Sequence, residues 1–266
     1  MSEPQQTSSI DLTAQIRRHL ESLRLAGVDW LPASAPLPPW TPDAPSAPLE
    51  TPAVEPMGLF EEASAPTVPT ASASTDDRRQ ELTLLAEQVS GCTRCKGLAA
   101  TRTQTVFGVG RIDPDLCFVG EAPGHDEDAQ GEPFVGPAGQ LLTRIITAMG
   151  MTREEVYICN ILRCRPPDNR PPLPEEAANC REYLERTLEL VRPKFLCALG
   201  ASAAKYLLGT SMGITRLRGK FMDWRGIPVM CTFHPSYLLR DPMKKKEVWE
   251  DMQALLRRMG KPIPQR

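Results

Sequence analysis

Four short apolar runs, each followed by a glycine or a polar residue, constrain the fold of this chain more than any other feature. They cover Leu116–Val119, Val156–Cys159, Phe195–Leu199 and Val229–Phe233. Continuous runs of four or five apolar residues are typical of strands buried on both faces. Apolar residues at helical spacing occur between most of the runs, at 138–149, 174–191 and 201–208, and after the last run, at 245–259. Strands that alternate with helices predict right-handed βαβ units and a parallel sheet covered on both faces.

Three of the predicted strands are followed directly by a side chain that could bind a ligand or take part in catalysis. Glu121 follows the first strand, Asn160 follows the second, and His234 follows the fourth. The carboxyl ends of parallel strands lie along one edge of the sheet, where open α/β sheets bind their ligands. We therefore expect residues that are about 110 positions apart in the sequence to line one pocket.

The first 75 residues differ in composition from the rest of the chain. Eleven prolines fall between Pro32 and Pro69, and such a segment buries too little apolar surface to offset its ordering entropy. We expect a disordered linker at 31–75, preceded by a short amphipathic helix at 10–26. This helix either packs on the core or on a protein partner, or is frayed. The chain then divides into an N-terminal extension, 1–75, and one domain, 76–266.

The charge distribution and the hydropathy of the sequence bear on whether the protein binds nucleic acid or enters a membrane. The net charge is −2, but residues 215–266 hold twelve Lys and Arg against five Asp and Glu. This basic segment suits contact with phosphates, although a solvated helix face has the same signature. No apolar run approaches the ~18 residues of a membrane span, and the N-terminus lacks the pattern of a signal peptide. We expect a cytoplasmic protein that does not enter a membrane.

The eight cysteines fall into two groups. Those inside the predicted strands behave as small buried hydrophobic residues: Cys117, Cys159, Cys197 and Cys231. Those outside the strands are Cys92, Cys95, Cys164 and Cys180. A CxxC pair followed by two distant cysteines fits ligation of zinc or of an iron–sulfur cluster; four unrelated free thiols are the alternative. Arg94, Arg163 and Arg165 lie close in sequence and would offset the negative charge of thiolates.

Several motifs follow one another between residues 82 and 259. They are GEAPG at 120–124, GEPFVGPAGQLL at 131–142, Asn160 with RCRPP at 163–167, and HPSYLLR at 234–240. With these motifs and the second group of cysteines, the sequence resembles the family-4 uracil-DNA glycosylases. The resemblance implies a three-layer α/β/α sandwich with a central four-stranded parallel sheet, and a [4Fe–4S] cluster rather than zinc on Cys92, Cys95, Cys164 and Cys180. It also implies an enzyme of base excision repair that flips uracil out of DNA and hydrolyses its N-glycosidic bond.

The resemblance gives each candidate side chain a role. Phe134 is expected to stack on the flipped base, and the Asn160 carboxamide to pair with N3–H and O4 of uracil. A neutral His234 is expected to donate to O2 of the departing base. Glu121 is expected to orient or activate water, and Glu127 is the second choice, or else crowds the methyl group of thymine. Without the resemblance, Phe134 is interpreted as a hydrophobic anchor, Asn160 as a turn cap and His234 as a structural histidine.

Further contacts with the base and with DNA are expected on both sides of the pocket. The turn formed by Ala122, Pro123 and Gly124 offers backbone groups to the base. After His234, the candidates for a wedge in the DNA gap or for phosphate contacts are Leu238, Leu239, Arg240, Lys244 and Lys245.

The expected partner is uracil-containing DNA, single- or double-stranded, and the enzyme is expected to be a monomer. Three other functions remain open at this point. They are a non-catalytic nucleic-acid-binding module with a structural cluster, a glycosylase for another deaminated base such as hypoxanthine, and a redox sensor that uses the cluster.

Overall fold

The computed structural model describes residue 13 and residues 74–265. The helix predicted at 10–26 and the linker predicted at 31–75 lie outside these residues, apart from Thr13, Ser74 and Thr75. Helix α2 (Thr75–Ser90) begins the described domain, and the Ser74 side chain caps it by accepting a hydrogen bond from the Asp77 backbone. The boundary between the extension and the domain, near residue 76, stays a prediction.

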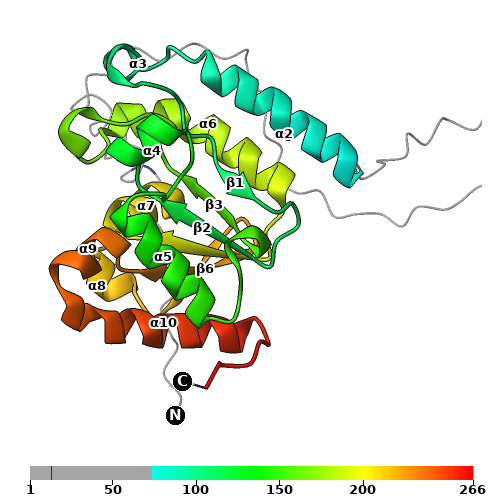
Figure 1. Ribbon diagram of the computed structural model, residues 1–266, viewed down its shortest axis with the longest axis vertical. Coiled ribbons are helices and arrows are strands. Elements are labelled where there is room, and N and C mark those ends of the chain that lie inside the picture. The colour runs from blue at the N-terminus through cyan, green and yellow to red at the C-terminus, as the bar shows by residue number, and fades with distance from the viewer. Residues whose placement is uncertain (1–12, 14–73, 266) are drawn as a thin grey trace, which may run out of the picture. The chain divides into compact units, whose positions relative to one another are not determined.

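A six-stranded sheet forms the middle of the domain, in the order β1-β3-β2-β4-β6-β5 (Figure 1). The strands are β1 (Val109–Gly110), β2 (Leu116–Gly120), β3 (Tyr157–Asn160), β4 (Phe195–Leu199), β5 (Phe221–Trp224) and β6 (Ile227–Thr232). The central four strands pair in parallel, as the apolar runs predict. Strands β1 and β5 add an antiparallel strand at each edge, so the predicted four parallel strands form the centre of a six-stranded sheet.

The two edge strands carry weak sequence signals. Strand β1 has only two residues, too few for a pattern. Strand β5 pairs with β6 across a two-residue turn, in which Arg225 and Gly226 have φ of 52° and 84°. Positive φ at both positions describes a type I′ hairpin turn. Asn-Gly or Asp-Gly is its usual signature, and Arg-Gly indicates it less clearly.

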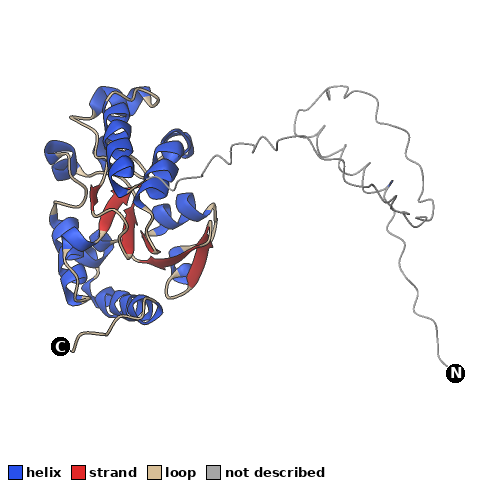
Figure 2. Cartoon of the chain, turned by 90° about the vertical axis from the view of Figure 1, so that its right-hand side faces the viewer, coloured by secondary structure: helices blue, strands red, loops and turns tan. Residues whose placement is uncertain are grey.

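Helices cover both faces of the sheet and complete the predicted three layers (Figures 1 and 2). The further helices are α3 (Lys96–Thr101), α4 (His125–Gln130), α5 (Pro137–Ala148), α6 (Pro174–Val191), α7 (Ala201–Leu208), α8 (Ile214–Leu217), α9 (Pro235–Arg240) and α10 (Lys245–Arg258). In β2, Leu116 and Phe118 belong to the core shared with α5 and α10, while Cys117 and Val119 belong to the core shared with α6 and α7. Both faces of β2 are therefore buried, which explains its continuous apolar run.

In the part of the chain that the structure describes, no helix has both the length and the apolar composition needed to cross a bilayer.

The order of the strands fixes where a ligand binds. From β2 the chain passes to β3 on one side of it, whereas β4 pairs with β2 on the other side. The crossover helix α5 packs on one face, and α6 and α7 pack on the opposite face. Such a reversal opens a crevice at the carboxyl ends of the strands. Here the crevice lies next to the residues that follow β2 and β4.

Candidate active site

A cavity of about 550 Å³ opens at the carboxyl edge of the sheet. The structure brings the predicted base-binding residues together in its lining: Glu121, Ala122, Pro123, Gly124, Phe134, Asn160 and His234. Gly200, which follows β4, and Arg240, at the end of α9, line the same cavity. All four parallel strands thus deliver residues to one site.

The Phe134 ring is held in place by two glycines. A Cβ atom on Gly120 would lie 2.5 Å from the ring, and a Cβ atom on Gly139 would lie 1.9 Å from the Phe134 carbonyl group. Phe134 itself has a φ of 56°, in the left-handed region that a side chain rarely adopts. The ring is 6% exposed and lines the cavity. Local backbone strain and close packing therefore fix its orientation.

Asn160, the last residue of β3, offers an unused hydrogen-bond acceptor. The residue is 1% exposed, and its Oδ1 atom has no hydrogen-bond partner among the described residues. A Cβ atom on Gly120 would lie 2.3 Å from this oxygen, so only glycine leaves room for it. A buried polar atom without a partner costs about 1–3 kcal/mol. A ligand that brings an N–H group to Oδ1 would recover this cost.

His234 presents a neutral ring with a defined tautomer. Its Nδ1 atom accepts a hydrogen bond of 3.1 Å from the Ser236 backbone N–H, so the proton of the neutral ring sits on Nε2. Burial lowers the pKa of His234 to about 4, and the positive charge of Arg240 acts in the same direction. The His234 and Phe134 ring centroids are 5.6 Å apart. The site thus holds an Nε2–H donor beside an aromatic ring at neutral pH.

The two candidate carboxylates have different surroundings. Glu127 accepts three backbone hydrogen bonds, from Gly124 at 3.1 Å and from Val135 and Gly136 at 3.0 Å each. These bonds join the turn after β2 to the loop that carries the aromatic ring. Glu127 therefore ties these two segments of the cavity wall together, and because it also lines the cavity, its expected catalytic or thymine-excluding role stays a prediction. The Glu121 carboxylate lines the cavity and has no side-chain partner among the residues described.

The expected DNA contacts separate into exposed and buried residues. Leu238 is 1% exposed and packs in the core with α5 and α10, so it cannot reach DNA, which corrects the sequence-based expectation. Leu239 is 44% exposed, and Arg240 and Lys245 are also exposed. Lys244 is held in an ion pair at the start of α10. The exposed members of this set are therefore Leu239, Arg240 and Lys245, and of these Arg240 lines the cavity.

The four cysteines outside the strands come from four segments. Cys92 follows α2, Cys95 caps the start of α3, Cys164 lies in the loop after β3, and Cys180 lies within α6. Electrostatic interactions join Cys164 to Cys92 and Cys95, and Cys180 to Cys95 and Cys164. The other four cysteines are fully buried in strands, as predicted.

Four cysteine sulfurs are a donor set that suits an iron–sulfur cluster or a zinc ion. Burial raises the pKa of Cys164, and raises that of Cys180 to about 11, while the charges of Arg102 and Arg163 oppose these shifts. No three of the described Cys, His, Asp and Glu side chains converge on a single ion. A [4Fe–4S] cluster places each cysteine on a different iron, so its ligands surround the cluster rather than one point.

The charges of two of the three arginines expected near these cysteines act on them. Arg94 pairs with Glu182 and its charge also acts on Cys92, whereas Arg165 donates to Asn169. Arg163 is buried and donates to the Asn160 carbonyl and to Thr187, although its charge also acts on Cys180. The guanidinium that donates to the sulfur of Cys164 belongs to Arg102, which the sequence did not single out.

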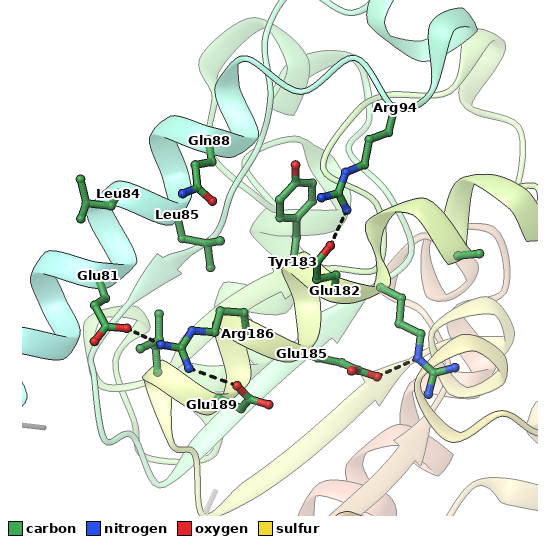
Figure 3. Close-up of a pocket in the computed structure, with 13 residues that line it drawn as sticks. Glu81, Leu84, Leu85, Gln88, Arg94, Glu182, Tyr183, Glu185, Arg186 and Glu189 are labelled. Carbon is green, nitrogen blue, oxygen red and sulfur yellow. Dashed lines mark hydrogen bonds and ion pairs between the residues drawn. The ribbon is translucent and has the colours of Figure 1, made fainter. Parts of the chain in front are cut away.

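A second groove, of about 690 Å³, runs between α2 and α6 (Figure 3). Its charged side chains pair with one another: Arg186 contacts Glu81 and Glu189, and Arg94 contacts Glu182. The groove shares no lining residue with the cavity at the strand ends. This groove is therefore lined by ion pairs between two packed helices, and it is separate from the predicted site.

Sequence reasoning missed part of the cavity wall. Asn169 and Arg170, in the loop after Cys164, also line the cavity. Asp168 and Asn169 both have a φ of 53°, which Asp and Asn adopt more readily than other side chains. The Asp-Asn pair between two Pro-Pro pairs signals a turn, but nothing in the sequence shows that this turn faces the site.

Comparisons with known proteins agree with this geometry. Residues 107–253 match the family model of the uracil DNA glycosylase superfamily. The chain is 44% identical over 180 residues to the type-4 uracil-DNA glycosylase of Thermotoga maritima, covering 66% of this chain and 93% of that protein. It is 40% identical over 188 residues to the type-4 uracil-DNA glycosylase of Archaeoglobus fulgidus, covering 68% and 94%. A type-5 uracil-DNA glycosylase of Pyrobaculum aerophilum is 31% identical over 146 residues, covering 48% and 64%.

Proposed function

This chain belongs to the type-4 uracil-DNA glycosylases, and we propose that the cavity at the strand ends is where it binds one uracil flipped out of DNA and hydrolyses the N-glycosidic bond. The observation that carries this assignment is the buried, unpartnered Oδ1 atom of Asn160, in a cavity also lined by Phe134 and His234. The product in DNA is an abasic site.

Asn160 selects the base. Uracil has a donor at N3–H and an acceptor at O4, which match the Oδ1 acceptor and the Nδ2 donor of the carboxamide. Cytosine has the opposite groups at both positions, so it would leave the buried Oδ1 unpaired and face Nδ2 with another donor. Sites that depend on such hydrogen bonds reject the wrong ligand by about 10⁴–10⁵.

Phe134 offsets the cost of removing the base from the DNA stack. Flipping costs a few kcal/mol, and stacking on an aromatic ring returns about 1–3 kcal/mol. The packing of Gly120 and Gly139 against Phe134 holds the ring in place before the base arrives, so little further ordering is needed.

His234 and Glu121 divide the chemistry between the base and the sugar. When the bond between C1′ and N1 breaks, its electron pair stays with uracil, and the Nε2–H group of His234 donates to O2 of the resulting anion. One such fixed donor is worth about 2.7–4 kcal/mol. Glu121 orients a water molecule whose oxygen bonds to C1′, and its carboxylate accepts the released proton. The negative charge of Glu121 also stabilises the positive charge that develops on the sugar.

DNA is held by the exposed residues beside the cavity. Leu239 or Arg240 fills the space left by the flipped nucleotide, and Lys245 contacts phosphate together with the other basic residues of the last quarter of the chain. Leu238 has no part in this contact because it is buried.

Cys92, Cys95, Cys164 and Cys180 hold a [4Fe–4S] cluster in this proposal; structural zinc is the alternative. The cluster fastens the turn between α2 and α3 to α6 and to the loop that leads to the cavity wall. A protein partner for residues 10–26, and a monomeric state, remain predictions.

Uracil release from a labelled single-stranded oligonucleotide tests the site assignment. We expect His234→Ala to lower kcat by about 10²–10³ because one preorganised donor is lost, and Asn160→Ala to lower kcat/KM strongly. Gln140→Ala, an exposed change on α5, serves as the control. Oligonucleotides that contain cytosine or hypoxanthine should not be cut. Wild-type rates in both site variants, or release of hypoxanthine as fast as uracil, would show that the site is assigned wrongly.

A further inference from the structure

Arg102 joins the end of α2 to one of the four cysteines outside the strands. It follows α3 directly and is half-buried. Its Nη1 atom donates to the Cys164 sulfur at 3.0 Å, and its Nη2 atom donates to the Ser90 carbonyl at 3.2 Å. We propose that Arg102 is the charged donor to the cluster-bound Cys164 thiolate, and that it both retains the cluster and raises its reduction potential.

The geometry of the contact suits a thiolate. At 3.0 Å the nitrogen lies as close to the large sulfur atom as it would to an ordinary oxygen acceptor. A neutral thiol is a weak acceptor, whereas a hydrogen bond between an ionised donor and an ionised acceptor is about twice as strong as a neutral one. Arg102 therefore gains most from Cys164 when the sulfur is ionised as a metal ligand.

The other polar groups around the cysteines have different partners. Arg94 lies over the Tyr183 ring at 4.4 Å from its centroid and donates to Glu182 at 2.8 Å, so it clamps the CxxC turn onto α6 (Figure 3). Asn179 places Nδ2 3.5 Å from the Cys95 sulfur, as a neutral donor. Among the described residues, Arg102 is the cation whose side chain donates to the sulfur of one of these four cysteines, whereas the Arg163 side chain interacts with Cys159, inside strand β3.

This contact has two separable consequences. The charge and the hydrogen bond favour the reduced cluster, which carries one more electron, and hydrogen bonds to the sulfurs are among the factors that set cluster potentials. The bridge to the Ser90 carbonyl adds a mechanical tie, since it anchors the Cys164 loop to the end of α2. Groups that support metal ligands in this way typically change metal affinity by 10–100-fold when they are removed.

The test compares three variants of the full-length, cluster-loaded protein. Arg102→Gln removes the charge and keeps an N–H group, while Arg102→Lys keeps the charge but cannot bridge two acceptors in the same fork geometry. Arg186→Gln is the matched control: it removes another arginine that ties a second segment to α2, here α6 through Glu81, and its partners among the described residues are carboxylates rather than a cysteine sulfur. The readouts are iron content, the rate of cluster loss under a chelator, and the reduction potential by protein-film voltammetry.

We expect cluster loss about 10-fold faster in Arg102→Gln than in wild type, with an intermediate rate in Arg102→Lys. The reduction potential should fall in Arg102→Gln and stay near wild type in Arg102→Lys, and Arg186→Gln should match wild type in both readouts. Equal potentials and equal rates of cluster loss in all proteins would overturn the inference.

The role of Arg102 rests on the cluster proposed above, and the iron content of the wild-type protein tests that cluster separately from the uracil-binding cavity. Wild-type protein that binds no iron overturns both the cluster and the role of Arg102. Uracil release by the same preparation then shows independently whether the assignment of the cavity stands.

Discussion

Substitution of Gly120 by alanine probes how tightly the base-binding wall is built. Gly120 ends β2, and its missing side chain lets Asn160 and Phe134 approach each other. The added Cβ would lie 2.3 Å from Asn160 Oδ1 and 2.5 Å from the Phe134 ring. Because Cβ atoms essentially never approach other atoms within 3.0 Å, the oxygen must shift by about 0.7 Å and the ring by about 0.5 Å.

These shifts set the expected magnitude. A displacement of about 1 Å at a reacting centre costs about 10²-fold in rate, so Gly120→Ala should lower kcat/KM for uracil release by about 10–100-fold. Overpacking of a buried site costs about 1–3 kcal/mol of stability, which leaves the protein folded. The loss of activity should therefore exceed the loss expected from unfolding.

Single-turnover uracil release and thermal melting of the same samples measure both effects. Gly213→Ala is the control, because a Cβ there would meet no atom within 4 Å and its φ lies in the ordinary negative range. A folded Gly120→Ala protein with wild-type kcat/KM would refute the claim that Asn160 and Phe134 must be held at these positions.

Four further predictions concern Glu127, His234 and Cys180. Glu127→Gln places an NH₂ group against a backbone donor, so we expect a loss of about 1–3 kcal/mol in unfolding free energy, and an unchanged Tm would count against its role as a tie between two loops. The pKa of His234 is about 4 in the folded protein against 6.5 for the free side chain, so its Nε2–H donor should keep uracil release steady from about pH 8 to about pH 5; a loss of rate centred near pH 6.5 would contradict this. For the same reason protonation of His234 favours the unfolded chain, and its contribution to stability should decline as the pH falls from 6.5 towards 4. Cys180→Ser should lower both the iron content and the Tm, because a ligand of a structural group contributes to folding, and full iron occupancy would exclude Cys180 as a ligand.

The central strands were predictable because burial on both faces leaves a mark in the sequence. Leu116–Gly120 and Phe195–Leu199 are continuously apolar apart from the terminal glycine, and helix α6 has the predicted bounds. The carboxyl-edge placement of Glu121, Asn160 and His234 follows from parallel pairing alone. Strand β1 was not predictable, because two residues have no period.

Side-chain roles within the site depended on contacts that no local pattern encodes. Glu127 reads as a free loop carboxylate, yet Val135 and Gly136, on the next loop, donate to it. Leu238 and Leu239 are adjacent and chemically identical, and only the docking of α9 decides which one is buried. Arg102 reaches a sulfur 62 positions further along the chain, a pairing visible only once the fold is known.

A crystal structure of this protein with uracil bound is the measurement that tests the central claim most directly. We predict that the base lies against Phe134, with its N3–H group on Asn160 Oδ1 and its O2 atom on the Nε2–H group of His234. Uracil bound elsewhere, or bound in the cavity with Asn160 Oδ1 still unpaired, would contradict the account.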